Sequence, residues 1–253
     1  MGFLRYQQQY HLDDPRATLA HREIILRKPF LKRLYQDWYS VFQNVSLAFP
    51  GGKFLEIGSG GGFLKEMMPS VITSDILPLD CVEQVFSAEE MPYKEKEISA
   101  IFMLNVFHHI PHPWKFLKEA QRVLVTGGKV VMIEPANSVF SKFIYKTFHH
   151  EPFDVKGGWE IQSSGPLSGS NQALPYIYFQ RDREKFEKEF PGLKICSVKY
   201  HTPFRYLISG GVSMKPLVPK WSFGFFTGLE KLISPLSRAL GMFATIEIEK
   251  TVK

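Results

Sequence analysis

The pattern of apolar and polar residues divides the chain into an N-terminal part with helical spacing and a longer part in which strands and helices alternate. From Ile24 to Phe42, apolar residues recur at near-helical intervals with an interruption around Pro29, which predicts two helices. Asp14 followed by Pro15 is typical of a helix start. Farther along, short apolar runs are separated by glycine turns and helical patterns. This alternation predicts an α/β domain built around a mostly parallel sheet.

The stretch from Lys53 to Lys65 carries the clearest chemical signal. Apolar residues up to Ile57 predict a buried strand, the glycine-rich segment 58–62 interrupts it, and Phe63–Met68 has helical spacing. Glycines let a ligand approach the backbone without interference from a Cβ atom, and the following helix presents unpaired N–H groups. This arrangement is typical of a nucleotide-binding loop.

Three known types of glycine-rich loop bind nucleotides, and the residues of this segment distinguish among them. A phosphate-binding loop requires Gly-Lys followed by Ser or Thr, but Lys65 is followed by Glu66. A dinucleotide loop requires a glycine at its sixth position, which counted from Gly58 is Phe63. The acidic Glu56 within the strand favours a ligand with a positively charged end, because burial of an unpaired carboxylate is costly.

This Glu-x-Gly-x-Gly-x-Gly pattern resembles motif I of the class I S-adenosylmethionine-dependent methyltransferases. The resemblance implies that the cofactor is S-adenosyl-L-methionine and that the residues of this motif bind it. These residues are Glu56, Gly58, Ser59, Gly60 and Gly62.

An acidic residue ends the next β-branched run, at residues 70–75. In a doubly wound sheet, a carboxylate at the end of the second strand can accept hydrogen bonds from both ribose hydroxyls. Asp75 lies seventeen positions after Gly58, close to the expected spacing of about 20. We therefore expect Asp75, together with the adjacent Ile76, to contact the ribose of the cofactor.

Two later segments extend the resemblance. The sequence from Ser87 to Tyr93 is similar to the family element that follows the third strand, in which an acid binds the adenine amino group and an alanine backbone meets the ring. Ser87 replaces the acid here, but a hydroxyl or a carbonyl can still accept from an amino group. Ala88 occupies the alanine position. Ile98–His109 then predicts a buried fourth strand that ends in a polar patch.

By the same resemblance, Asn105 lies at the methionine end of the cofactor, and His108 or His109 faces the substrate. The segment from Arg122 to Glu134 is similar to the helix, glycine turn and fifth strand of the family. The resemblance thus runs over residues 53–135, about a third of the chain, with its motifs in the expected order.

The resemblance implies a Rossmann-like methyltransferase fold, a doubly wound, mostly parallel seven-stranded sheet with helices on both faces. Residues 193–200 and 243–249 predict the last two strands, which usually form an antiparallel pair in this family. We expect three regions, which are an N-terminal helical cap at 1–50, a core domain at 51–202 and 243–253, and an apolar helical insertion at 203–242. The last could be a lid or core over the active site, or a peripheral contact with a membrane surface.

Composition narrows the functional classes. The chain of 253 residues has only two cysteines, which excludes a disulfide scaffold and favours a reduced, cytoplasmic setting. The net charge of +6 comes from the N- and C-terminal flanks rather than the middle of the chain. No compact basic cluster with interleaved aromatics indicates nucleic-acid binding. The longest uncharged apolar C-terminal run, Trp221 to Leu229, is far shorter than a bilayer requires.

Candidate bases and metal ligands come from the polar segments after the strands. For a hydroxyl or carbon acceptor, His109, His150 or Glu134 could remove a proton, whereas other acceptors need no base. We expect no metal, because adjacent histidines diverge in an extended chain and no carboxylate or cysteine completes a ligand spacing nearby. The polar loop at 149–169 is the candidate substrate lid.

The leading prediction is an enzyme that transfers a methyl group to a small-molecule acceptor, which the apolar insertion suggests is apolar or lipid-linked. Two alternatives remain open. A nicotinamide-dependent dehydrogenase would use a related sheet but a different glycine spacing. The second alternative is a non-catalytic binding module. It remains open because Ser87 and Ser99 replace acids that the family usually has. The acceptor, the atom that is methylated and the oligomeric state are not determined by these patterns.

Overall fold

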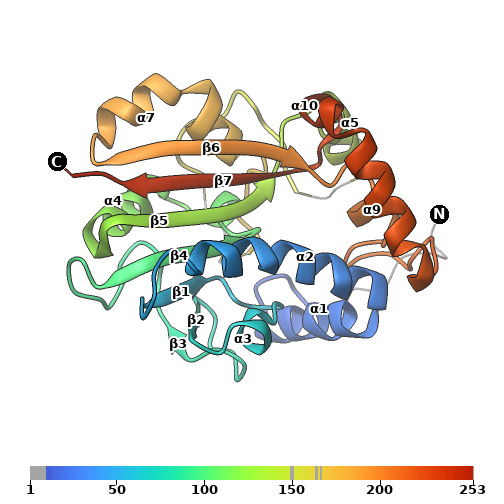
Figure 1. Ribbon diagram of the computed structural model, residues 1–253, viewed down its shortest axis with the longest axis horizontal. Coiled ribbons are helices and arrows are strands. Elements are labelled where there is room, and N and C mark those ends of the chain that lie inside the picture. Colours follow the sequence, from blue (N-terminus) through green and yellow to red (C-terminus); the bar gives the residue numbers. More distant parts are fainter. Residues whose placement is uncertain (1–9, 149–150, 163–164, 166, 253) are drawn as a thin grey trace.

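A seven-stranded sheet forms the centre of the computed structural model, which describes residues 10–148, 151–162, 165 and 167–252 (Figure 1). The strands are β1 (Phe54–Ile57), β2 (Val71–Asp75), β3 (Gln84–Val85), β4 (Ile98–Leu104), β5 (Leu124–Pro135), β6 (Leu193–His201) and β7 (Phe243–Lys250). Their spatial order is β3-β2-β1-β4-β5-β7-β6. Neighbouring strands from β3 to β5 are parallel, whereas β7 is antiparallel to both β5 and β6.

This topology confirms the predicted fold class. The last two strands form the expected antiparallel pair even though an insertion separates them in the sequence. The usual dinucleotide-binding sheet has six parallel strands in the order 3-2-1-4-5-6. Because an antiparallel strand lies between β5 and β6 here, the topology opposes the nicotinamide-dependent alternative.

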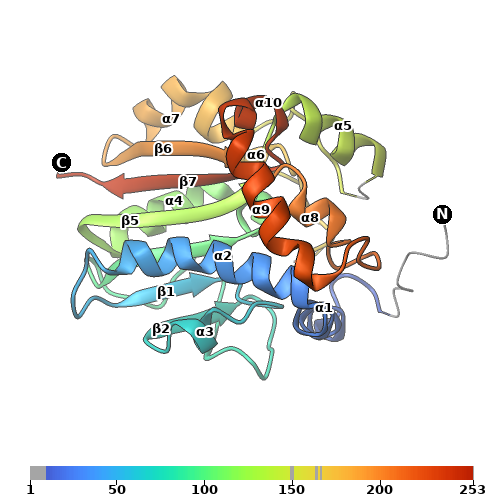
Figure 2. The same ribbon diagram turned by 45° about the vertical axis from the view of Figure 1, so that its right-hand side comes forward.

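Helices cover both faces of the sheet. They are α1 (Pro15–Arg27), α2 (Pro29–Ser46), α3 (Leu64–Met67), α4 (Pro113–Val123), α5 (Val139–Phe148), α6 (Leu174–Tyr176), α7 (Arg183–Glu189), α8 (Arg205–Ile208), α9 (Phe223–Leu232) and α10 (Ser237–Leu240). On one face, Phe42 of α2 stacks on Phe102 of β4 with ring centroids 4.9 Å apart. Figures 1 and 2 show α4 on the opposite face, where it packs against β5.

The two N-terminal helices follow the sequence prediction. The Asp14 side chain caps α1 by accepting the backbone N–H of Arg16 at 2.9 Å, and Pro15 occupies the first turn. Pro29 begins α2 after a single intervening residue, Lys28. One face of α2 is apolar and buried in the core, which is what its helical spacing of apolar residues requires.

Two predicted boundaries near the glycine loop differ in the structure. The helix after the loop, expected over Phe63–Met68, is the single turn α3, because Pro69 disfavours helical geometry at the preceding residue. The fourth strand ends at Leu104 rather than continuing to the histidines. It ends there because Asn105 takes a left-handed conformation with φ of 57°.

The predicted glycine turn before the fifth strand is a bulge within that strand. Residues of β5 pair with β4 at Leu124 and again from Lys129 onward, with the register shifting between these points. Gly127, with φ of 77°, supplies the positive φ that the bulge requires.

The insertion between β6 and β7 packs against the N-terminal helices. Arg205 of α8 bonds Asp37 of α2 and Glu230 of α9, each across 2.6 Å. The ammonium group of Lys28 donates to the carbonyl oxygens of Gly211, at 2.6 Å, and Met214. These contacts fix the insertion at one end of the sheet, where Figure 2 shows α9 crossing in front of the strands.

The predicted break of the insertion helix at Ser234 and Pro235 is confirmed as a short 3₁₀ turn. The predicted apolar stripe is less buried than a core helix face. Leu236 is exposed, and the other members are only partly buried, namely Phe226, Leu229, Ile233 and Leu240. Among the described residues, no helix combines the length and apolar character needed to cross a bilayer.

Candidate active site

A cavity of about 1520 Å³ opens at the C-terminal ends of β1, β2 and β4. The ends of parallel strands are where open α/β sheets bind ligands. Helix α1, helix α5 and residues 206–214 of the insertion form its other walls. All ten residues predicted to bind the cofactor line this cavity, although their roles in binding stay predictions. They are Glu56, Gly58, Ser59, Gly60, Gly62, Asp75, Ile76, Ser87, Ala88 and Asn105.

The glycine loop is fixed to the neighbouring strand by hydrogen bonds. The backbone N–H of Ser59 donates to the carbonyl of Ser74 at 2.9 Å, and the N–H of Gly60 donates to a carboxylate oxygen of Asp75 at 3.0 Å. A Cβ atom at Gly58, where φ is 68°, would collide with the Val106 side chain. The loop is therefore closely packed, and the glycines keep side chains out of the space above it.

Glu56 and Asn105 each have a buried side-chain oxygen that has no hydrogen-bond partner among the described residues. Burial raises the pKa of Glu56 to about 7, and the charge of Asp75 adds to this effect. The left-handed backbone of Asn105 is a strained conformation of the kind that clusters at ligand sites. Buried acceptors without partners are uncommon, so both oxygens point to a ligand that brings donors or positive charge.

Asp75 and Ser87 contribute polar groups to the same cavity. The second oxygen of the Asp75 carboxylate accepts the N–H of Leu77 at 2.9 Å, and burial raises the pKa of this carboxyl group. Each carboxylate oxygen has a further lone pair, which leaves acceptor capacity for ribose hydroxyls. The Ser87 hydroxyl accepts the N–H of Glu89 at 3.2 Å and still has its own proton to donate.

Next to this region lies a network of two histidines and two glutamates, of which His108 and Glu134 are buried. Glu134 is fully buried, and one of its oxygens accepts the N–H groups of Val106 and Phe107, both at 2.8 Å. Its other oxygen lies 2.6 Å from Nδ1 of His108. With both oxygens engaged and no place on the cavity wall, Glu134 orients His108. We therefore correct its expected role as a base.

The two histidines have opposite protonation behaviour. Burial lowers the pKa of His108, but the negative charges of Glu134 and Glu151 outweigh this and raise the pKa to about 9. Burial, followed by the charge of His108, lowers the pKa of His109 to about 4. His109 is therefore a neutral imidazole at pH 7. The third predicted base, His150, lies outside the described residues.

Sequence reasoning missed Glu151 and wrongly expected the adjacent histidines to diverge. Phe107–His109 form a 3₁₀ turn rather than an extended strand, so the rings of His108 and His109 lie 4.2 Å apart. Glu151 comes to them from the end of the segment after α5, more than forty positions later in the chain. Of the described residues of the predicted lid, Glu151, Gly165 and Leu167 line the cavity.

Comparisons with known proteins support a methyltransferase domain and its fold. A family model described as a methyltransferase domain matches residues 55–132, which contain the glycine loop, Asp75 and the two histidines. No curated protein matches the sequence. A chain of the complex between the Haloferax volcanii Trm112 methyltransferase activator and a protein described as a methyltransferase is 14% identical, with a TM-score of 0.53. The match covers 96% of this chain and 99% of that one.

Two further structures are more distant. A geranyl diphosphate C-methyltransferase from Streptomyces coelicolor is 12% identical, with a TM-score of 0.46, over 98% of this chain and 90% of that one. A protein described as a sarcosine dimethylglycine methyltransferase from Galdieria sulphuraria is 15% identical, with a TM-score of 0.45, over 87% and 86%. At these levels of similarity the substrates of the relatives do not carry over to this chain.

Fold, glycine loop and domain match together define a nucleotide-type cofactor site on a seven-stranded sheet with an antiparallel last strand. The chain carries a methyltransferase domain at residues 55–132, within the fold of the class I S-adenosylmethionine-dependent methyltransferases. The residues fit this cofactor, because the partnerless oxygens of Glu56 and Asn105 suit its positively charged methionine end and Asp75 suits its ribose. When bound, S-adenosylmethionine supplies an electrophilic methyl group on a sulfonium centre.

Proposed function

We propose that the enzyme methylates an apolar, lipid-like small molecule. The observation that carries this proposal is the size of the cavity, about 1520 Å³. Pockets that enclose one drug-sized ligand usually measure roughly 300–1,000 Å³. A cofactor in the glycine-loop region therefore leaves room for an acceptor of substantial size beyond it.

Outside the glycine loop, many apolar side chains line the cavity, together with polar ones such as Lys28, Glu151 and Gln172. Ile144, Tyr145 and Phe148 of α5 lie on one side of it. Tyr206 and the chain that follows it, including Leu207, Val212 and Met214, lie on another. An acceptor with an alkyl or isoprenoid portion would bury apolar surface against these walls, which stabilises binding by about 25 cal/mol for each Å² removed from water.

A membrane surface is the proposed source of such an acceptor. Helix α5 and the insertion carry most of the exposed large hydrophobic side chains of the described residues. They are Val139, Phe143, Phe148, Leu217, Trp221, Phe225, Leu232 and Leu236. Exposed basic side chains lie among them, including Lys142, Lys146, Lys220, Lys231 and Arg238. Apolar side chains mixed with basic ones are typical of surfaces that bind anionic lipid. Because α5 also lines the cavity, the acceptor would enter from the membrane side.

The chain contributes to methyl transfer mainly by alignment and exclusion of water. Positioning alone can lower a barrier by about 7–11 kcal/mol. Among the proposed bases, His109 lines the cavity as a neutral imidazole, but its pKa of about 4 makes it a weak acceptor of protons. We infer that His109 orients the acceptor, with proton removal secondary.

The test uses S-adenosylmethionine labelled with deuterium in its methyl group. Protein and cofactor are incubated with the lipid extract and, separately, with the water-soluble extract of the source cells, and products are identified by mass spectrometry. We expect labelled product in the lipid extract, and much less of it at limiting cofactor with the Asp75→Asn variant, which is designed to bind cofactor weakly. Labelled product only in the water-soluble extract would refute an apolar acceptor while leaving the enzyme class intact.

A further inference from the structure

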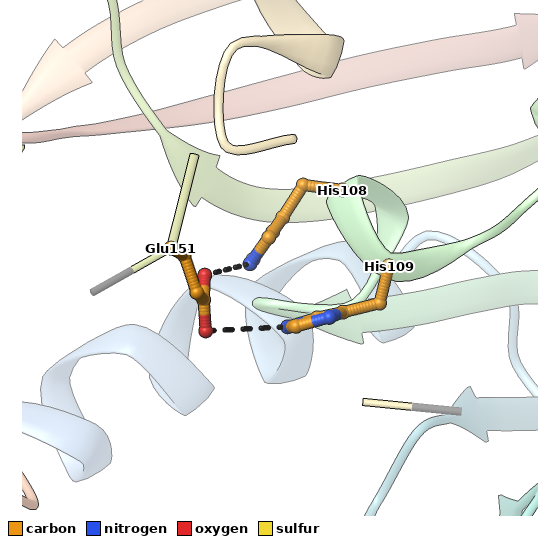
Figure 3. A group of neighbouring side chains, drawn as sticks. All are labelled: His108, His109 and Glu151. Atoms are coloured by element: carbon orange, nitrogen blue, oxygen red, sulfur yellow. Dashed lines mark ion pairs between the residues drawn. The ribbon is translucent and has the colours of Figure 1, made fainter. Parts of the chain in front are cut away.

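Two histidines and a glutamate converge on one point at the cavity wall. In Figure 3, His108 and His109 extend from the 3₁₀ turn after β4, and Glu151 reaches them from the opposite side. Nε2 of His108 lies 3.5 Å from one Glu151 oxygen, and Nε2 of His109 lies 3.8 Å from the other. The three groups offer ligand atoms that all lie within 4.8 Å of one another.

These separations fit a shared cation better than direct hydrogen bonds. Nitrogen-to-oxygen hydrogen bonds in proteins are usually about 2.7–3.2 Å long. In a tetrahedral zinc site, bonds of roughly 2.0–2.2 Å to nitrogen and oxygen place neighbouring ligand atoms about 3.4 Å apart. The distances from Glu151 to His108 and His109 are close to that edge length.

The far side of each imidazole is held in the way metal-binding histidines are usually held. Nδ1 of His108 faces the Glu134 carboxylate at 2.6 Å, and Nδ1 of His109 faces the carbonyl of Gly169 at 3.3 Å. Because a carboxylate and a carbonyl only accept, Nδ1 of each ring carries a proton, and a metal ion bound at Nε2 would displace any proton there. This leaves Nε2 as the ligand atom, with the ring orientation fixed by its outer partner.

We propose that Nε2 of His108, Nε2 of His109 and the carboxylate of Glu151 bind one divalent transition-metal ion of the zinc type. Two imidazoles and one carboxylate are a ligand set for such ions, whereas magnesium and calcium prefer oxygen ligands alone. Gln172 donates to Glu151 at 3.0 Å and would orient the carboxylate, as Glu134 orients His108.

All three proposed ligands line the cavity, so a coordination position is left on that side. Three protein ligands with one open position are typical of catalytic rather than structural zinc sites. Resting on the proposed function, this arrangement selects an acceptor that carries an oxygen ligand, such as a hydroxyl or carbonyl, next to its apolar portion. The metal would hold this oxygen in place.

The experiment measures metal binding without cofactor or acceptor. Full-length protein is treated with a chelator and dialysed, then titrated with Zn²⁺ by calorimetry and, in parallel, with Co²⁺, whose visible absorption reports its coordination geometry. The test variants are Glu151→Gln and His109→Gln. His108 is left intact, because its buried bond to Glu134 makes a folding failure hard to distinguish from loss of a ligand. Circular dichroism checks that each variant is folded.

The matched control is His112→Gln. His112 is a neighbouring histidine that also faces a glutamate, with Nδ1 3.1 Å from Glu89, but it does not line the cavity. We expect one Zn²⁺ per chain for the wild type and for His112→Gln. Removal of a residue that only orients a metal ligand usually lowers metal affinity roughly 10–100-fold. Because each test variant removes a ligand itself, its Zn²⁺ affinity should fall by at least that factor.

Two results would overturn the metal site. One is a wild-type protein that takes up no stoichiometric Zn²⁺ or Co²⁺. The other is binding that is unchanged in both Glu151→Gln and His109→Gln. The metal titration contains no acceptor, so it does not depend on whether a lipid-like product is found. In the same way, a failure to bind metal would not change the result of the methylation test.

Discussion

The carboxylate of Asp75 accepts the backbone N–H of Gly60 across 3.0 Å, which links the end of β2 to the glycine loop after β1. The same side chain lines the cavity where the ribose is predicted to bind. Asp75 therefore fixes the loop, and we expect the same carboxylate to provide acceptors for the cofactor. Loss of the charge should affect both.

Replacement of Asp75 by asparagine is expected to weaken cofactor binding about 10–100-fold, because hydrogen bonds to a charged group contribute about 1.5–3 kcal/mol. The new amide would also place a donor against the N–H of Gly60 or Leu77. Titration calorimetry with S-adenosylhomocysteine gives the affinity. The control is Asp80→Asn, an exposed acid five positions away, which should bind like the wild type. Equal affinities for all three proteins would show that Asp75 does not contact the cofactor.

Cofactor affinity should depend on pH through Glu56. Its pKa in the free protein is raised to about 7 by burial, so the carboxyl group is mostly protonated at pH 6 and mostly ionised at pH 8. A cationic ligand binds the ionised carboxylate of Glu56 more strongly than the neutral acid. Below the pKa, Glu56 must therefore release its proton before the ligand can bind in this way. Affinity for S-adenosylmethionine is therefore expected to fall by up to about tenfold per pH unit below pH 7.

Glu56→Gln provides the comparison for this prediction. The glutamine cannot ionise, so the variant should bind more weakly at pH 8 and should show a much flatter pH profile between 6 and 8. Both profiles are measured by calorimetry in buffers of different ionisation enthalpy, which also counts the protons released. A wild-type affinity that does not change over this range would mean that Glu56 lies apart from the charged end of the cofactor.

The glycine loop and the position of Asp75 were predictable because they depend on local sequence, whereas the seven-stranded sheet was expected from the family resemblance. Apolar runs and glycines within a few positions of one another determine where β1 ends and the loop begins. The cluster of His108, His109 and Glu151 was not predictable in this way. It requires a 3₁₀ turn that rotates adjacent histidines to the same side and a glutamate delivered by a distant loop. Neither signal is present in the spacing of residues around 108.

The insertion at residues 203–242 also combines features that depend on local sequence with features that depend on distant contacts. Its helical spacing and the break at Pro235 were visible in the sequence, but spacing alone does not tell which face is covered. In the structure it is fixed by Lys28, Asp37 and Arg205, whose partners lie far away along the chain. Only the tertiary contacts show that much of its apolar surface stays exposed.

A methyl group at Gly62 should destabilise the loop. The added Cβ would overlap the hydroxyl of Tyr39, a fully buried side chain that accepts the N–H of Phe63 at 3.2 Å. Overpacking of this kind usually costs about 1–3 kcal/mol. The matched control is Gly61→Ala, where the nearest atom would lie 3.4 Å from the new Cβ, an ordinary contact. Thermal unfolding should show a lower Tm for Gly62→Ala only, and equal Tm values would contradict the packing argument.

Glu230 should stabilise the attachment of the insertion. It lies almost buried, accepts the N–H groups of Phe204 and Arg205, and pairs with the Arg205 guanidinium at 2.6 Å. Removal of one partner of a buried ion pair costs about 3–5 kcal/mol, so Glu230→Ala should lower the free energy of unfolding by that order. It should also speed proteolysis within residues 203–242.

The control for this effect is Glu187→Ala. Glu187 forms an exposed pair with Arg183 on α7, with half of each side chain accessible to solvent. Such surface pairs contribute about 0.2–1 kcal/mol, and urea unfolding should resolve the difference. Similar losses in the two variants would show that Arg205 and Glu230 do not secure the insertion.

Exposed aromatic side chains on the insertion should determine whether the protein binds membranes. Trp221, in the 3₁₀ turn before α9, is 83% exposed, and Phe225, in the first turn of α9, is 68% exposed; Lys220 precedes Trp221 in the chain. Burial of such a side chain in a lipid interface contributes about 1.5–3 kcal/mol, so Trp221→Ser with Phe225→Ser should reduce partitioning onto anionic vesicles at least tenfold.

Leu47→Ser is the matched control. Leu47 is also 77% exposed, but it follows the end of α2 that lies opposite the insertion. Co-sedimentation with phosphatidylglycerol vesicles and with neutral vesicles measures both parts of the prediction. The wild type should prefer the anionic vesicles because of the basic side chains around the aromatics. If the double variant and Leu47→Ser sediment alike, the apolar surface of α9 has another role, and the acceptor reaches the cavity from solution.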